Sequence, residues 1–385
     1  MCIRDRVLPG KKSGIPQYKN TKEKLDSWIK SGIMVSNGRP SIYVYMQEYK
    51  IGKSIKTRRG FISLLKIETD EKGKAHPHEK IFKSPKMDRF NLMRETRAHL
   101  SPIFTIYKDK NRQADKILSS AVKAKKADVD INFQGTRERL WAISDEEIIR
   151  KLSLFMKSQK VFIADGHHRY EASAHLKQYM RKKERPAQNV MPYDYTLAFF
   201  LSMQDKGMVI LPTHRVIKRL PGNFSFDFMK ERLERCFDVT ILKSKNTLVD
   251  KLEAAYRNKK HAFGFFYDDK FILAVLKEEK ILNTIKPSQN HKAWRKLDVN
   301  ILHQIILSSL FKIKETINGK RNIYYYRDKA EAIKAVKSGN FKMAVFLNPT
   351  KIEEVETIAA AGHRMPQKST YFYPKLLTGM VVHKF

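Results

Sequence analysis

The sequence predicts a mixed α/β fold of the α+β type, arranged in two domains. Apolar runs typical of β-strands alternate irregularly with amphipathic helical patterns, several strand pairs are separated only by short turns, and no internal repeat is found. The chain has 385 residues, of which 42% are hydrophobic, so it can bury more than one core. The charged stretch 181–189, which contains Pro186, is the best boundary. We therefore expect domains over 1–185 and 186–385.

The first half predicts a β-hairpin followed by alternating helices and strands. Residues 140–159 carry Ser144 and Glu147 in the spacing of a capping box, ahead of an apolar-periodic helix. Residues 109–130 predict an exposed helix with a loop. The remaining expected elements are helices at 22–33 and 86–100, the hairpin strands at 41–50 and 61–69, and strands at 103–109 and 161–164.

The second half predicts a similar mixture. A hairpin is expected over 261–277 with its turn at Asp268–Asp269, and a buried helix over 297–311. A later helix is expected to be capped by Thr350 with Glu353. The other expected elements are strands at 195–203, 208–217, 323–327, 343–348, 369–375 and 380–385, and helices at 226–237 and 328–338.

Membrane spans, secretion and structural cysteines are not expected. No run approaches 18 apolar residues, the start has no signal-peptide pattern, and the two cysteines supply neither a disulfide framework nor a zinc site. We expect a cytoplasmic protein. The first six residues, MCIRDR, resemble adapter read-through, so we expect residues 1–6 to be artefactual and the natural first segment to be missing.

The formal net charge of +36 raises the question of a nucleic-acid partner. The chain has 52 lysines and 24 arginines, spread along its whole length without a basic tail. Recognition of phosphates or bases favours clustered arginine, so this distribution favours a solvated lysine coat. Nucleic acid stays open as a partner.

The strongest candidate site is the stretch VFIADGHHRYEAS, which predicts a strand, a tight turn and a helix. Asp165 is the expected N-cap and Gly166 permits an unusual backbone. His167, His168 and Arg169 then open the helix, although a helix amino end carries partial positive charge and disfavours cations. A bound phosphate would satisfy all of these groups together. The alternative is that Arg169 pairs with an acidic residue such as Glu171, and that the histidines are ordinary.

The same histidines do not predict a metal site. His167 and His168 diverge by about 100° around a helix, whereas helical chelation uses positions i and i+4. His168 and His175 share a face but lie two turns, ~10 Å, apart. No metal site made by the protein alone is expected.

Two further motifs could contribute to a site. His78 and Glu79 in HPHEK could act as a general base or bind magnesium, or could lie in a solvated loop. Thr213, His214 and Arg215 end a predicted strand and suit a phosphate, although a salt bridge is an equal alternative.

The stretch GHRMPQKST is not a Walker A loop. Gln367 stands where the second glycine belongs, Pro366 removes an N–H, and a strand pattern follows in place of a helix. Lys368 and Ser369 remain candidates for lining a site. No dinucleotide fingerprint, serine nucleophile elbow or cysteine nucleophile is found.

Motifs spread over nearly the whole chain from about residue 20 resemble the prokaryotic family called domain of unknown function 1015 (DUF1015). The most specific are FIADGHHRYEAS and MPQKSTYFYPKLLTGMVVHKF; the others are RPSIYVYMQEY, RRGFISLLKIE, HPHEK, KMDRFNLM, SPIFTIY, LWAISD, VILPTHRV and LDVNILH. Members of that family usually begin with a Pro-Pro-Tyr-Asp segment, which this chain lacks.

The strand–turn–helix around Gly166 is in turn similar to that of the ParB/sulfiredoxin-like superfamily, whose matching turn binds nucleotide phosphates. The resemblance implies a domain of that type over 1–185, followed by a second α/β domain. It implies that Gly166, His167, His168 and Arg169 contact the phosphates, with Asp165 positioning the turn or a magnesium ion.

By the same resemblance we expect a phosphotransferase acting on a small molecule, similar to a free serine kinase. ATP or ADP, or else CTP, with Mg²⁺ would be the nucleotide. The expected catalytic residues are Asp165, His168 and Glu79, and the expected substrate residues are Thr213, His214, Arg215, Lys368 and Ser369. The alternatives are a nucleotide-gated, ParB-like DNA- or RNA-binding protein without catalysis, and a structural protein that binds only inorganic phosphate. The oligomeric state is not predicted.

Overall fold

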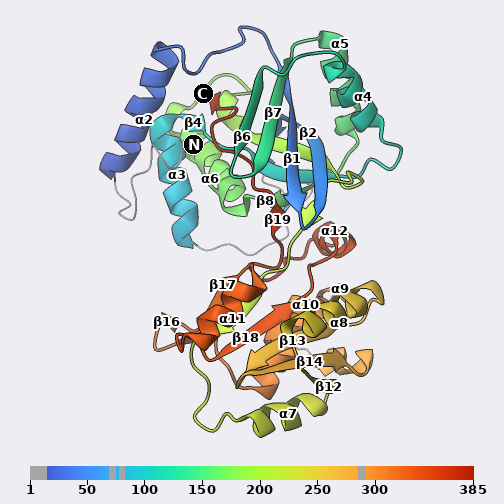
Figure 1. Cartoon of the computed structure of the whole chain (residues 1–385). Coiled ribbons are helices and arrows are strands. Elements are labelled where there is room, and N and C mark those ends of the chain that lie inside the picture. Colours follow the sequence, from blue (N-terminus) through green and yellow to red (C-terminus); the bar gives the residue numbers. More distant parts are fainter. Residues whose placement is uncertain (1–14, 69–74, 78–82, 285–291) are drawn as a thin grey trace. The chain divides into compact units, whose positions relative to one another are not determined.

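The computed structural model describes residues 15–68, 75–77, 83–284 and 292–385. It has a mixed α/β fold, as the sequence predicts, and the chain divides into two compact units (Figure 1). Unit 1 comprises Met1–Val209 and Phe372–Phe385, and unit 2 comprises Ile210–Tyr371. This division differs from the expected one at 185/186, because the strand that follows residue 186 pairs inside the sheet of unit 1 and the chain end returns to that unit.

Unit 1 is built on an eight-stranded sheet with the order β3-β8-β5-β9-β2-β1-β7-β6. Two neighbouring pairs are parallel, β3 with β8 and β5 with β9, and the other pairs are antiparallel. The strands are β1 (Ile42–Ile51), β2 (Ser54–Lys66), β3 (Ala75–Pro77), β5 (Ile103–Tyr107), β6 (Val129–Phe133), β7 (Thr136–Ile143), β8 (Val161–Asp165) and β9 (Tyr195–Ser202).

Helices cover this sheet through separate apolar clusters. Figure 1 shows α4 and α5 on one flank and α2, α3 and α6 on the other. Leu118 of α4 and Leu152 of α5 are buried against strand residues such as Trp141, while Phe90 of α3 packs with Leu176 of α6. The helices are α2 (Ile15–Lys30), α3 (Lys83–Thr96), α4 (Gln113–Val122), α5 (Glu146–Lys157), α6 (His167–Glu184) and the 3₁₀ turn η1 (Pro192–Asp194).

The end of the chain returns to unit 1. The short strand β20 (His383–Lys384) pairs antiparallel with β4 (Ala98–His99), with His383 opposite His99. Gly379 N donates to Leu100 O at 3.0 Å, so the segment follows the chain immediately before β5. Fourteen residues that follow unit 2 in the sequence are thus part of the fold of unit 1.

Unit 2 has a six-stranded antiparallel sheet with the order β12-β14-β13-β18-β11-β17. Its strands are β11 (His214–Ile217), β12 (Phe237–Leu242), β13 (Ala262–Tyr267), β14 (Lys270–Leu276), β17 (Ile323–Tyr326) and β18 (Met343–Leu347), with a two-stranded ribbon of β15 (Thr316–Ile317) and β16 (Lys320–Arg321). The short strands β10 (Val209–Ile210) and β19 (Phe372–Tyr373) lie where the chain passes from one unit to the other.

Helices α8 and α11 pack on the sheet of unit 2 through buried aliphatic side chains such as Leu248 and Ile333. The helices of this unit are α7 (Phe226–Glu234), α8 (Lys245–Arg257), η2 (Glu279–Thr284), α9 (Lys292–Arg295), α10 (Asp298–Asn300), the π-helix η3 (Ile301–Leu310), α11 (Lys329–Lys337) and α12 (Ile352–Ala360). The predicted buried helix at 297–311 is therefore a short α-helix that continues as a π-helix.

Two predicted helix caps are wrong. Residues 140–143, at the start of the stretch 140–159, belong to β7, which pairs with β1 and β6. The helix expected behind a Ser144 cap begins at Glu146. Its N-cap is Asp145, whose carboxylate accepts from Ile148 N at 2.9 Å, and not Ser144. Thr350 does not cap α12 either; its hydroxyl donates to Ser369 O, and Lys351 occupies the cap position.

Several predicted strands are shorter than expected; the one at 380–385, for example, forms only over His383–Lys384. The run at 208–217 is interrupted at 211–213, which contains Pro212, and gives the separate strands β10 and β11. The run at 369–375 forms a strand only over Phe372–Tyr373. The carbonyl of Tyr371 accepts from Leu211 N at 2.8 Å, and the carbonyls of Pro374 and Lys375 accept from side chains, as described below.

Candidate functional site

The turn between β8 and α6 has a backbone that requires glycine. Gly166 has a φ of 94°, and a Cβ there would lie 2.9 Å from Nη2 of Arg169. Gly166 is also the N-cap of α6, without a side-chain cap bond, so the expectation that Asp165 is the N-cap is wrong. The first N–H groups of a helix lack intrahelical acceptors, and the N-cap glycine has no side chain that could accept from them.

Arg169 folds back over this turn onto the chain before β5. Its Nη1 donates to Ser101 Oγ at 2.6 Å and to the carbonyl of Pro102, and its Nη2 donates to Asp165 Oδ2 at 3.2 Å. The sequence left open whether Arg169 binds a phosphate or pairs with an acid of the chain. It does pair with an acid, but with Asp165; Glu171 lies 3.8 Å from Lys86 instead.

A second cation reaches the same carboxylate from the end of the chain. Nζ of Lys375 donates to Asp165 Oδ1 at 2.7 Å, although the two residues are 210 positions apart. Sequence reasoning did not select Lys375 as a site residue. The available signal was the joint presence of DGHHRYE and TYFYPK among the family motifs, which the structure explains as a direct contact.

Two cations of the cluster, Lys375 and Arg169, pair with the same carboxylate. Burial would raise the pKa of Asp165, but the charges of Lys375 and then Arg169 outweigh it and lower the pKa to about 2. The Asp165 side chain keeps 37% of its surface exposed, and that of Lys375 keeps 39%. The amino end of α6 therefore presents an accessible ammonium group beside its first N–H groups.

The two histidines of the turn diverge, as expected for adjacent helical positions. His167 is buried, with 4% of its surface exposed, and its charge contributes to the lowered pKa of Asp165. His168 is half-buried. A ligand at this turn would therefore meet His167 chiefly through its backbone.

The candidates for the substrate side lie in unit 2, where the structure brings four of the five together. Arg215 is fully buried; its Nη1 donates to Thr213 O, and its Nη2 lies 3.5 Å from Lys368 O. Ser369 is buried, and its carbonyl accepts from Thr350. These contacts use backbone oxygens, so they tie the turn at 368–369 to β11.

His214 has a different environment from the other four. It is 1% exposed, lies edge-on to Phe346 in the core, and burial lowers its pKa to about 3, assisted by the charge of Lys329. Burial favours the neutral imidazole at His214, and its expected part in substrate binding stays a prediction. A residue that the sequence analysis missed, His303 on the π-helix, lies with Nε2 3.4 Å from Arg215 Nε and Nδ1 3.3 Å from Glu315.

Glu79 and His78 lie outside the described residues. The strand before them, β3, runs parallel to β8, so both strands end at the same edge of the sheet. Within the described ranges, no group of three or more His, Cys, Asp or Glu residues could hold a metal ion.

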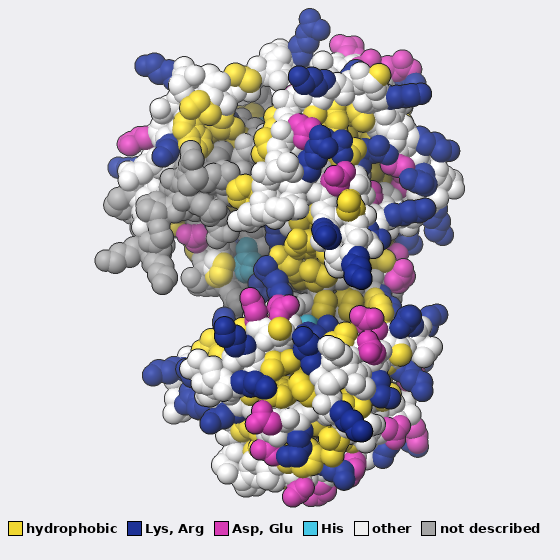
Figure 2. All heavy atoms as spheres, in the orientation of Figure 1, with side chains coloured by type: hydrophobic (Ala, Val, Ile, Leu, Met, Phe, Trp, Pro, Cys, Tyr) yellow, Lys and Arg dark blue, Asp and Glu magenta, His cyan; other side chains and the backbone are white. Residues whose placement is uncertain are grey.

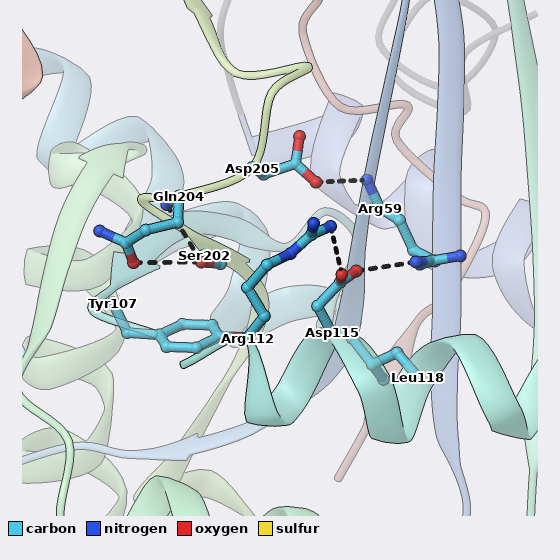
Figure 3. A pocket seen from close by; sticks show the side chains of 8 residues that line it. All are labelled: Arg59, Tyr107, Arg112, Asp115, Leu118, Ser202, Gln204 and Asp205. Atoms are coloured by element: carbon cyan, nitrogen blue, oxygen red, sulfur yellow. Dashed lines mark hydrogen bonds and ion pairs between the residues drawn. The ribbon is translucent and has the colours of Figure 1, made fainter. Parts of the chain in front are cut away.

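A small polar pocket lies at the opposite edge of the sheet, beyond the carboxyl ends of the parallel strands β5 and β9 (Figure 3). Arg59 and Arg112 point toward each other there and share Asp115, at 2.7 and 2.6 Å. Asp205 accepts from the backbone N of Arg59 at 3.2 Å. The arginines of this pocket therefore pair with a carboxylate of the chain.

Figure 2 shows lysine and arginine side chains scattered over the visible face of both units, with acidic side chains among them. No helix among the described residues is long and apolar enough to span a membrane.

Comparison with known proteins identifies the family. A family profile described as "Protein of unknown function (DUF1015)" matches residues 4–300, which include the β8–α6 turn. The chain belongs to the DUF1015 family. No curated protein sequence matches.

Several solved structures resemble this DUF1015 chain at low sequence identity. A mutant free serine kinase in complex with AMP has a TM-score of 0.41 and 11% identity, covering 82% of this chain and 89% of its own. A conserved hypothetical protein from Pyrococcus furiosus has a TM-score of 0.38 and 12% identity, covering 82% and 92%. SbnI from Staphylococcus aureus, truncated at its C-terminus, has a TM-score of 0.39 and 9% identity, covering 82% and 85%. The sequence-based resemblance to the ParB/sulfiredoxin-like superfamily stays a prediction.

Proposed function

We propose that the amino end of α6 binds the terminal phosphates of a nucleotide and that the protein is a phosphotransferase acting on a small molecule. The observation that supports the proposal is the Lys375–Asp165–Arg169 cluster, in which two cations pair with the same carboxylate at the start of α6. Backbone N–H groups of His167 and His168 would donate to phosphate oxygens, and Lys375 would turn from Asp165 toward them.

Each group has a distinct role in this proposal. Gly166 lets the backbone approach the ligand closely, and Arg169 holds the turn through Ser101 and Pro102 while adding positive charge. With a pKa of about 2, Asp165 is a weak base, so it orients the two cations and accepts no proton. Phosphoryl transfer depends mainly on such positioning and charge neutralisation.

The acceptor side of the proposal rests on the sequence. The bond from the terminal phosphorus to its bridging oxygen would break, the acceptor oxygen would bond to phosphorus, and the acceptor proton would pass to a base. Glu79 is the candidate base, with His168 as the second. Free serine is the first acceptor to test, with ATP or ADP, or CTP, as donor. Magnesium would arrive with the nucleotide.

The first experiment is calorimetric titration of the protein with ADP and with inorganic phosphate. We expect ADP to bind, and Lys375→Ala to weaken binding by about tenfold, the value of one charge-assisted hydrogen bond. Lys384→Ala is the matched control: it removes a lysine of the same terminal segment, which pairs with Asp26 at 2.5 Å and not with Asp165. Equal ADP affinities of wild type and Lys375→Ala would show that Lys375 does not bind the phosphates.

Catalysis is tested separately with serine and each nucleotide. Formation of O-phosphoserine that is lost in Glu79→Gln, with ADP affinity retained, supports the phosphotransferase. Nucleotide binding without product over a panel of hydroxyl metabolites would leave a binding protein. Duplex DNA or RNA binding that changes with nucleotide and weakens with salt would favour the ParB-like alternative.

A further inference from the structure

Three polar side chains form a buried row across the centre of the sheet of unit 1. In the strand register, Gln47 of β1 lies opposite Arg58 of β2 on one side and opposite Glu138 of β7 on the other. Their exposed fractions are 0%, 0% and 1%, respectively. We call these three residues the carbonyl clamp, because of the groups that they hold.

The clamp binds three successive peptide carbonyls of the C-terminal segment. Arg58 Nη1 donates to Tyr373 O at 3.0 Å, and Arg58 Nη2 donates to Pro374 O at 2.5 Å. Gln47 Nε2 donates to Lys375 O at 3.2 Å. The backbone of Lys375 is therefore fixed at the residue itself and at the two residues before it.

The clamp is also connected internally. Arg58 Nε donates to Gln47 Oε1 at 2.8 Å, and Gln47 Nε2 donates to Glu138 Oε1 at 2.9 Å. Tyr45 OH donates to the other oxygen of Glu138 at 2.5 Å. If the C-terminal segment left, the buried donors of Arg58 would lose two acceptors, which is costly for a charged group.

Ring contacts reinforce the same attachment. Phe372 lies edge-on to Phe104 at 5.3 Å, and Tyr373 lies edge-on to Tyr49 at 5.4 Å. The guanidinium of Arg58 lies 5.0 Å from the centre of the Phe104 ring. Aromatic side chains therefore contact the segment at Phe372 and Tyr373, next to the carbonyls that the clamp binds.

We propose that Arg58, Gln47 and Glu138 are positioning residues for the phosphate site, acting through Lys375. This inference rests on the proposed function, because it assumes that Lys375 binds the phosphates. A lysine side chain is long and flexible, and that of Lys375 is partly exposed, so its reach to the start of α6 depends on where its backbone is fixed. The hydrogen bonds from Arg58 and Gln47 to the carbonyls of residues 373–375 fix that backbone.

The test compares Arg58→Met with Arg59→Met in the full-length protein. Arg59 is the next residue of β2 and points to the opposite face, where it pairs with Asp115, so it is the matched control. Two readouts are used: calorimetric ADP affinity, and amide hydrogen exchange of residues 372–377. We expect Arg58→Met to weaken ADP binding about as much as Lys375→Ala, and to speed exchange of the segment while β1, β2 and β7 stay protected.

The double variant Arg58→Met/Lys375→Ala separates positioning from general destabilisation. If Arg58 acts through Lys375, the double variant binds ADP no more weakly than Lys375→Ala alone. Additive losses would overturn the proposal. Arg58→Lys keeps the buried charge but cannot bond both carbonyls and Gln47 as a fork, so we expect an intermediate affinity and intermediate exchange.

The outcomes for the two proposals are distinguishable. If wild type fails to bind ADP or phosphate, the proposed function fails, and the exchange of residues 372–377 in Arg58→Lys still shows whether the clamp holds the segment. If Lys375→Ala weakens ADP binding and both Arg58 variants bind like wild type, the site stands and the clamp proposal is wrong.

Discussion

Asp165 pairs with two cations from different parts of the chain, Arg169 and Lys375. The interpretation of the α6 turn as a phosphate site rests on these two ion pairs. The sequence predicted the importance of the turn from its crowded positive charge, and the structure shows that one carboxylate balances part of that charge. The sequence could not predict Lys375 as the second cation, because a contact between residues 210 positions apart leaves no local sequence pattern. The sequence also could not predict that His214 is buried beside Phe346, because a histidine beside an arginine at the end of a strand has the same sequence whether it faces a ligand or the core.

The ion pairs of Asp165 make a prediction about acid stability. Its folded pKa of about 2 lies below the ordinary value of 3.8, so the stability that it contributes is complete above about pH 4 and is lost as the pH falls toward 2. We expect the free energy of unfolding of Asp165→Asn to fall less steeply over that range than that of wild type. Urea denaturation at a series of pH values measures both slopes. Parallel slopes would show that Asp165 is not paired in solution.

Buried His214 makes a prediction in a different pH range. Burial lowers its folded pKa to about 3 from 6.5, so its contribution to stability is complete above pH 6.5 and is lost as the pH falls toward 3. His214→Gln should therefore lose less stability between pH 6.5 and 4 than wild type does. Thermal unfolding at fixed ionic strength tests this, and an unchanged pH dependence would place His214 in a hydrated site instead.

At the scale of elements, helices, strands and hairpins could be predicted where the sequence signal is local. Strand β8, the glycine and helix α6 follow directly from the sequence, and so do the hairpins β1–β2 and β13–β14. Strand β7 was missed because Leu140, Trp141 and Ile143 continue into an apolar-periodic helix, and only the pairing with β1 and β6 reveals the strand. The π-helix at 301–310 likewise has no distinguishing local pattern.

The backbone of the β8–α6 turn is tested by Gly166→Ala against Gly135→Ala. Both glycines have positive φ, 94° and 78°, but a Cβ at Gly135 meets nothing within 4 Å, whereas one at Gly166 meets Arg169. We expect both variants to lose about 1–2 kcal/mol of stability from backbone strain. Only Gly166→Ala should also weaken ADP binding, as measured by calorimetry; equal affinities in the two variants would show that the turn does not form the site.

The start of α5 is tested by removing its cap. Asp145→Ala should cost about 1 kcal/mol of stability, because the carboxylate accepts from Ile148 N. Ser144→Ala is the matched control and should be nearly neutral, since that exposed serine is outside the helix. Chemical denaturation compares the two, and a larger loss in Ser144→Ala would restore the capping box that the sequence suggested.

At the scale of the whole molecule, unit 2 is inserted into the sequence of unit 1. The boundary expected at 185/186 followed from a charged, proline-containing stretch, but that stretch only connects α6 to β9, which is a central strand of the same sheet. The final fourteen residues then return to unit 1, and they include Lys375, which bonds to Asp165. Composition does not predict such a return, because the residues of the terminal segment do not indicate which unit they pack against.

The most direct measurement is a crystal structure of the protein with bound ADP. The account predicts the terminal phosphate within hydrogen-bond distance of the backbone N–H groups of His167 and His168 and of Nζ of Lys375, with Arg169 still on Ser101. ADP bound elsewhere, with the Lys375–Asp165 pair intact and no phosphate at the start of α6, would contradict it.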